Sequence, residues 1–151
     1  MSDADDRAAV REAAVRLLAR REYAVAELTS RLRGRGHDEG VVVAVIDQLQ
    51  DEGLVSDERF VEVFVRSRLE RGAGPMKIEA ELRQRGVDTA LAQPHLEGVD
   101  WRQRAREVHR QRFGDGPPPA ERREWARQAR FLQGRGFTTD QVRQALDADD
   151  F

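Results

Sequence analysis

Apolar residues recur three and four positions apart along this chain, which is the spacing of an amphipathic helix, whereas strict apolar–polar alternation is scarce. One stretch shows the pattern clearly, because Val42, Val45, Ile46 and Leu49 share a single helical face. Glycine or proline separates successive amphipathic stretches. We therefore predict helix throughout the chain, with a turn at each joint.

A five-residue phrase occurs three times, as Leu32-Arg33-Gly34-Arg35-Gly36, Leu82-Arg83-Gln84-Arg85-Gly86 and Leu132-Gln133-Gly134-Arg135-Gly136. The closing glycines lie 50 residues apart in both intervals. Self-similarity at a fixed period is the signature of a repeat protein. The predicted fold is therefore all-α, with three tandem three-helix repeats forming an elongated, curved array.

The repeat divides the chain into segments with expected boundaries. We expect a disordered acidic N-terminus at 1–8, repeat 1 at 9–55, repeat 2 at 56–99, repeat 3 at 100–147 with a Gly/Pro-rich loop at 114–119, and a frayed C-terminus at 148–151. Repeat units of this kind share thin cores with their neighbours, which suits a chain with 39% hydrophobic and 36% charged residues.

Turn and capping residues place the helix ends. Gly36 suits the left-handed residue that follows a helix, and Gly74-Pro75 suits a helix start. Pro94 is expected to kink or shorten its helix, and a long helix is predicted from about Pro119 to Arg135. The predicted N-caps are Asp38, Ser56, Asp100 and Thr138, the last forming a capping box with Gln141.

The formal net charge is −2, but the charge alternates in sign along the chain. Segments 16–35, 59–86 and 101–130 carry net charges of +4, +3 and +5, whereas 38–58 holds seven acidic and no basic side chains. If the basic segments stack on one side, they form a positive stripe. An ordinary set of salt-bridged helix surfaces explains the same pattern.

Composition also sets the location and excludes some chemistry. There is no cysteine, so neither a disulfide framework nor a thiolate metal site can form. The acidic N-terminus lacks the apolar segment of a secretory signal, and no apolar stretch is long enough to span a bilayer. We predict a cytoplasmic protein that does not engage membranes.

The chain shows no constellation typical of an enzyme. His37, His95 and His109 are far apart and lack partners at metal-ligand spacing. The serines lack a nucleophile-elbow motif, and no Walker motif is present. We predict no catalytic residue, no cofactor site and no metal site.

The basic side chains remain as candidate contacts with a phosphate-bearing or acidic partner. On a helix, Arg123, Arg127 and Arg130 share one face, and like charges on one face repel unless an anion bridges them. Trp101 and Trp125 are read as core anchors. The candidate partner contacts are Arg66, Arg71, Lys77, Arg83, Arg85, Arg123, Arg127 and Arg130.

Three segments resemble the bacterial RecX regulatory proteins. Arg71–Pro75 with Ile78 and Glu81–Gly86 resembles the family signature R-G-x-G-P-x-x-I-x-x-E-L-x-x-R-G. Flanking family segments are resembled by Asp51–Phe60 followed by Phe64–Arg66, and by Phe131–Phe137. Two positions depart from the family pattern. Ala24 stands where a capping serine is common, and Pro94 interrupts a helix that is usually regular.

This resemblance implies a regulatory protein that binds RecA. It implies a protein that lodges in the groove of the RecA–DNA filament, inhibits ATP hydrolysis, strand exchange and co-protease action, and promotes filament disassembly without catalysis of its own. We predict that the chain acts as a monomer. The family offers no invariant active-site residues to transfer, so the candidate contacts rest on charge.

Two alternatives stay open. An autonomous, sequence-independent DNA-binding helical repeat protein would bind naked DNA with a steep salt dependence. Net charge and the acidic segments oppose this as the main role, although weak direct DNA binding fits either hypothesis. A generic helical adaptor would have inert basic faces, and substitution of Arg83 and Arg85 would then leave partner binding intact.

Overall fold

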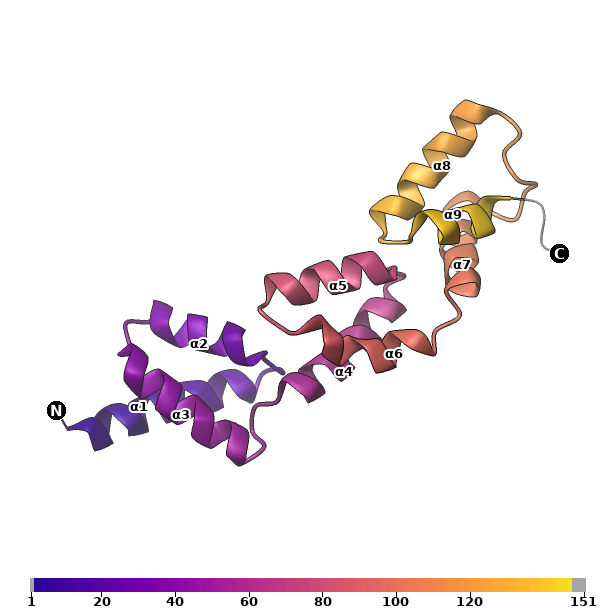
Figure 1. Cartoon of the computed structure of the whole chain (residues 1–151). Helices are drawn as coiled ribbons and strands as arrows, with labels where there is room; N and C mark the ends of the chain where they lie inside the picture. The colour runs from indigo at the N-terminus through magenta and orange to yellow at the C-terminus, as the bar shows by residue number, and fades with distance from the viewer. Residues whose placement is uncertain (1, 148–151) are drawn as a thin grey trace. The chain divides into compact units, whose positions relative to one another are not determined.

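The computed structural model describes residues 2–147 of the chain, and within them it contains nine α-helices, one 3₁₀ helix and no strand (Figure 1). The predicted all-α class is confirmed. The helices are α1 (Asp3–Leu18), α2 (Val25–Gly34), α3 (Glu39–Asp51), α4 (Asp57–Glu70), α5 (Pro75–Gln84), the 3₁₀ helix η1 (Thr89–Ala92), α6 (Gln93–Glu97), α7 (Trp101–Phe113), α8 (Arg122–Gly134) and α9 (Thr139–Leu146).

The chain divides into two compact units. The first unit contains the residues up to 64 together with 82–91, and the second contains 65–81 together with the residues from 92 onward. The division passes through two helices in the middle of the chain, because α4 and α5 each contribute residues to both units.

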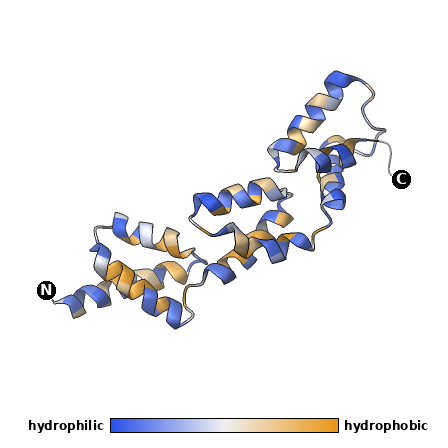
Figure 2. Ribbon diagram, viewed as in Figure 1, coloured by the Kyte–Doolittle hydropathy of each residue, from blue (hydrophilic) through white to orange (hydrophobic). Residues whose placement is uncertain are grey.

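The first unit holds the bundle of α1, α2 and α3, which pack on one another in pairs. Its core is a continuous apolar cluster that includes Val10, Leu17, Leu28, Leu32 and Leu49, all at most 3% exposed. Figure 2 shows hydrophobic positions concentrated on α3. Burying side chains of this size is the main stabilisation available to such a small bundle.

The second unit holds the bundle of α7, α8 and α9, which also pack pairwise. Its core contains Leu132, Val142 and Leu146, and Trp101 and Trp125 pack against it while partly exposed. The two tryptophans are thus core anchors, as the sequence predicted. Because α7 and α8 are largely hydrophilic, the apolar cluster occupies one narrow face of each (Figure 2).

The third helix of the middle repeat is interrupted, as expected from Pro94, but the break lies before the proline and not at it. The segment forms the 3₁₀ turn η1 and then the short α6, whose first turn contains Pro94. Proline is tolerated in a first turn because the backbone N–H that it lacks has no partner there. The proline therefore starts a helix after the break and does not kink a longer one.

The predicted caps are confirmed by their hydrogen bonds. Each side-chain oxygen accepts from the backbone N–H three residues on, at 3.1–3.2 Å, for Asp38, Ser56, Asp100 and Thr138. The side-chain oxygen of Gln141 accepts a hydrogen bond from the Thr138 N–H at 2.9 Å, which completes the capping box. Gly36, Gly86 and Gly136 all have the positive φ expected after a helix.

Two predicted boundaries need correction. The predicted disorder of 1–8 is wrong from Asp3 onward, because Ser2 caps α1 through the Asp5 N–H at 3.2 Å. Acidic side chains in the first turn also interact favourably with the helix dipole. The helix predicted from Pro119 begins instead at Arg122. Met1 and the predicted frayed segment 148–151 lie outside the described residues.

Candidate functional site

The candidate contacts lie on three helices and their ends. Arg85 is half-buried and paired with Glu27, and Arg127 is paired with Glu124, which limits what these two side chains can bind. The remaining six lie at exposed positions, namely Arg66, Arg71, Lys77, Arg83, Arg123 and Arg130.

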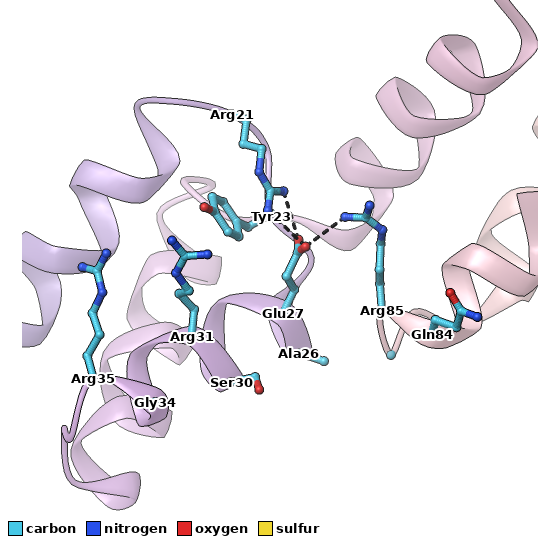
Figure 3. A pocket seen from close by; sticks show the side chains of 11 residues that line it. Arg21, Tyr23, Ala26, Glu27, Ser30, Arg31, Gly34, Arg35, Gln84 and Arg85 are labelled. Carbon is cyan, nitrogen blue, oxygen red and sulfur yellow. Dashed lines mark hydrogen bonds and ion pairs between the residues drawn. The ribbon is translucent and has the colours of Figure 1, made fainter. Parts of the chain in front are cut away.

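A pocket of about 680 Å³ lies within the first unit, where α2 faces the turn that follows α5. We call it the first junction. Figure 3 shows Arg21, from the turn before α2, and Arg85 on either side of Glu27, while Arg31 and Arg35 lie farther along the chain. Its lining residues with charged side chains are Arg21, Glu27, Arg31, Arg35 and Arg85.

Glu27 is the centre of the first junction. Both of its carboxylate oxygens accept hydrogen bonds from Arg21 at 3.1 Å, and Arg85 donates to the same carboxylate at 2.9 Å. The Ala24 N–H also donates to Glu27, at 3.3 Å. Because Ala24 has no side-chain oxygen to cap α2, Glu27 supplies half of a capping box. The helix start is held further by the Val25 N–H, which donates to Asp57 at 2.8 Å.

The environment keeps Glu27 ionised. Burial alone would raise its pKa, but the hydrogen bonds from Arg21 and the Ala24 N–H, with the charges of Arg21 and Arg85, outweigh burial and lower the pKa. The hydrogen bond to Glu27 correspondingly raises the pKa of Arg21. The junction therefore holds one carboxylate between two guanidinium groups.

Aromatic rings fix both guanidinium groups of the first junction. Arg21 lies 3.6 Å from the centre of the Tyr23 ring, and Arg85 lies 5.2 Å from the Phe64 ring. Phe64 in turn stacks on Phe60 at 5.6 Å. Cation–π contacts of this kind hold a guanidinium over one face of a ring, so these arginines are preorganised.

A smaller pocket of about 270 Å³ lies within the second unit, and we call it the second junction. Two turns meet there through the backbone, because the Gly74 N–H donates to the Arg135 carbonyl at 2.7 Å and the Met76 N–H to the Gly136 carbonyl at 2.9 Å. A Cβ on Gly74 would overlap backbone atoms of Gly136 and Phe137. The glycines of the Arg71–Pro75 motif thus allow the close approach of the two turns.

The second junction is also basic. Its lining residues are Arg68, Arg71, Ala73, Lys77, Glu81 and Arg135. Arg68 pairs with Glu81 at 2.9 Å, and both side chains are mostly buried. Arg135 donates a side-chain hydrogen bond to the Arg71 carbonyl. The structure thus brings two predicted contacts, Arg71 and Lys77, together with one that the sequence did not single out, Arg135.

The arginines of α8 form a separate exposed group. Arg127 donates two hydrogen bonds to Glu124, at 2.6 and 3.0 Å, and lies 5.2 Å from the Phe113 ring. Hydrogen bonds from Arg127, which has the larger effect, and from Gln128 lower the pKa of Glu124 to about 2. Arg127 is thus partly neutralised, whereas Arg123 and Arg130 lie at exposed positions on the same helix.

Sequence reasoning named Arg71, Lys77 and Arg85 but missed Arg21 and Glu27 of the first junction and Arg135 of the second. Glu27 and Arg85 are 58 residues apart, and Arg135 and Arg71 are 64 apart, so no local motif connects them. One signal was present: Arg21 and Arg85 recur 50 residues later as Arg71 and Arg135.

The described residues offer few sites for other chemistry. Among residues 2–147, no group of three or more His, Asp or Glu side chains could hold a metal ion. Over the same range, no helix is both long and apolar enough to cross a bilayer.

Family models match three consecutive parts of the chain. They are described as the first, second and third three-helix domains of RecX, and they match residues 11–49, 56–95 and 100–146. The tandem three-helix organisation predicted from the 50-residue repeat is thereby confirmed.

Similarity along most of the chain agrees with these matches. The chain is 57% identical to the Regulatory protein RecX of Halorhodospira halophila over 144 residues, covering 94% of this chain and 89% of the relative. It is 43% identical to that of Pseudomonas fluorescens, covering 94% and 92%. The crystal structure of RecX from Lactobacillus salivarius has the same fold, with a TM-score of 0.79 at 22% identity over 94% and 95% of the two chains. The chain therefore belongs to the RecX family of regulatory proteins.

Proposed function

We propose that this chain binds RecA and the RecA–DNA filament as a monomer and inhibits ATP hydrolysis, strand exchange and co-protease action. It would thereby modulate recombination and DNA repair by binding, without catalysis of its own. The observation that carries this proposal is the match to all three RecX domains in tandem, from residue 11 to residue 146.

The two basic junctions support a binding role. In the first junction Glu27 engages Arg21 and Arg85, which leaves Arg31 and Arg35 for a partner. The second junction presents Arg71, Lys77 and Arg135. Such groups suit acidic protein surfaces or phosphates. Exposed arginines of α5 and α8 add further positive charge. Within the described residues, Arg83, Arg123 and Arg130 have no carboxylate partner. Long-range attraction from such groups speeds association with a charged partner.

The test is RecA's ATP hydrolysis on single-stranded DNA, with this protein added at increasing ratios and RecA taken from the same organism. We expect inhibition below one protein per RecA. Absence of inhibition at a several-fold excess would overturn the proposal.

A matched pair of variants tests whether the exposed arginine Arg83 contributes to binding. Arg83→Glu changes an exposed α5 side chain, and Arg143→Glu makes the same charge change on α9. We expect Arg83→Glu to raise the concentration for half-inhibition by roughly tenfold, which is about 1.4 kcal/mol of binding. Arg143→Glu should change it little. Equal effects would mean that only overall charge matters.

A further inference from the structure

The two junctions are related by the 50-residue repeat. Arg21 corresponds to Arg71, Arg85 corresponds to Arg135, and the position of Glu27 is taken by Lys77. An equivalent pair of arginines therefore lines each junction. The first junction combines its pair with the carboxylate of Glu27, and the second combines its pair with the ammonium group of Lys77.

The first junction shows what this pair of arginines holds. Glu27 accepts from Arg21 and Arg85 at 2.9–3.1 Å, so two guanidinium groups bind one oxyanion (Figure 3). Charge-assisted hydrogen bonds from guanidinium to an oxyanion are among the strongest in proteins. The carboxylate of Glu27 is thus an internal example of the ligand that the arrangement favours.

The second junction lacks an internal oxyanion at this position. The one acidic side chain that lines it, Glu81, pairs with Arg68 at 2.9 Å. Across residues 2–147, no carboxylate lies within ion-pair distance of Arg71, Lys77 or Arg135. Three like charges around one pocket repel one another, and a bound anion would relieve that repulsion.

Arg135 is already held in position for such a ligand. Its side chain donates to the Arg71 carbonyl, and its guanidinium carbon lies 5.9 Å from the centre of the Phe131 ring. A Cβ on Gly72 would come within 2.7 Å of Nη2, so the glycine makes room for the guanidinium. A guanidinium carries five N–H donors, so the bond to one carbonyl leaves others for the pocket.

We propose that Arg71, Lys77 and Arg135 form a phosphate site that binds the backbone of a nucleic acid strand. Two guanidinium groups saturate the planar carboxylate in the first junction, whereas the second adds a third cation. A tetrahedral phosphate can accept from three cations in different directions, with arginine as the bidentate donor and lysine as a point charge. Successive phosphates of one strand would supply enough charge for the whole cluster.

This site can be tested on the protein without RecA, so the proposal does not depend on the proposed regulation of RecA. The test is binding of a fluorescent single-stranded oligonucleotide, followed by anisotropy across a series of salt concentrations. Lys77→Gln and Arg71→Gln change exposed side chains, and Arg143→Gln is the control with the same charge change. Each junction variant should weaken binding about five- to tenfold and reduce the salt slope by about 1. The proposal is overturned if both behave like the control.

Lys77→Glu provides a second, opposite test. It would place a carboxylate between Arg71 and Arg135, as Glu27 lies between Arg21 and Arg85. We expect oligonucleotide binding to fall further than with Lys77→Gln, while the melting temperature stays equal or rises. Retained oligonucleotide affinity in folded Lys77→Glu would contradict the site.

Competitors identify the source of the anion. ATP and inorganic phosphate that displace the oligonucleotide only at millimolar concentration support a strand-backbone site. Displacement by micromolar ATP, lost in Lys77→Glu, would assign the same phosphate site to free nucleotides. If polyglutamate of matched charge competes as well as the oligonucleotide, phosphate recognition is overturned in favour of an acidic protein partner.

Discussion

At the scale of single residues, what an arginine of this protein can bind depends on whether another residue already holds its side chain. Arg85 looks like a surface contact in the sequence, yet Glu27 and the Phe64 ring hold it in the first junction. Arg83, two positions earlier, lies exposed on α5. Substituting both arginines together would thus mix a structural defect with a change at the surface, so Arg83 is the cleaner probe of partner binding.

Glu27→Gln should destabilise the first unit at neutral pH. It leaves Arg21 and Arg85 without a counter-charge, and an ion pair intermediate between exposed and buried is worth about 1–2 kcal/mol. The folded-state pKa of Glu27 lies below its ordinary 4.5, so its contribution is full above that value and is lost as the pH falls through the folded pKa. Urea denaturation at pH 7 and pH 3 should show a smaller difference from the unmodified protein at pH 3.

Glu12→Gln is the matched control for that prediction. Glu12 pairs with Arg16 one helical turn away, and both side chains are mostly exposed. Its removal should leave the urea midpoint almost unchanged, because exposed pairs contribute little. Equal losses from Glu12→Gln and Glu27→Gln would show that the first junction adds no stability of its own.

At the scale of elements, helix starts were predictable where a local hydrogen bond determines them. Asp38 and Asp100 cap their helices with their own side chains, so the sequence rule suffices. The start of α8 was misplaced because its N-cap, Glu121, makes no side-chain cap bond. Trp125 packs against the core of the α7–α9 bundle. This is a tertiary effect, which a rule based on the position of Pro119 cannot include.

Gly74→Ala should disrupt the meeting of two turns. Its methyl group would overlap backbone atoms of Gly136 and Phe137, which flexible side-chain movement cannot relieve. We expect a loss of about 3 kcal/mol or more in the free energy of unfolding, because the turns and their two backbone hydrogen bonds must separate. Thermal denaturation followed by circular dichroism measures the loss.

Gly134→Ala is the corresponding control within α8. Nothing lies within 4 Å of a Cβ built there, and alanine has the higher helix propensity. We expect a melting temperature equal to or above that of the unmodified protein. If both alanine variants melt alike, the close approach at Gly74 is not a constraint on the fold.

At the scale of the whole molecule, the sequence predicted the helices and their repetition better than the site. The phrase ending in Gly36, Gly86 and Gly136 is periodic, so a 50-residue offset alone predicts the repeat. The site needs pairings between residues 58 and 64 positions apart, which charge and periodicity do not specify. Arg71 and Lys77 were found because they are basic and lie in the matched motif, whereas Glu27 and Arg135 required the fold.

The repeat also supplies three equivalent leucines that test how the chain unfolds. Leu32, Leu82 and Leu132 are each 0% exposed, and truncation to alanine at such a position costs about 2–5 kcal/mol. Hydrogen exchange should show Leu32→Ala lowering protection in α1–α3, and Leu132→Ala lowering it in α7–α9, because these bundles belong to different compact units. Each variant serves as the control for the other.

Leu82→Ala should behave differently from both. Leu82 belongs to the first unit, but the helix that carries it, α5, begins at Pro75 in the second. Loss of this side chain should therefore lower protection in both units, since nearest-neighbour coupling along a repeat protein passes through shared elements. If Leu32→Ala instead lowers protection equally from α1 to α9, the chain unfolds as one cooperative body and the two-unit division has no energetic meaning.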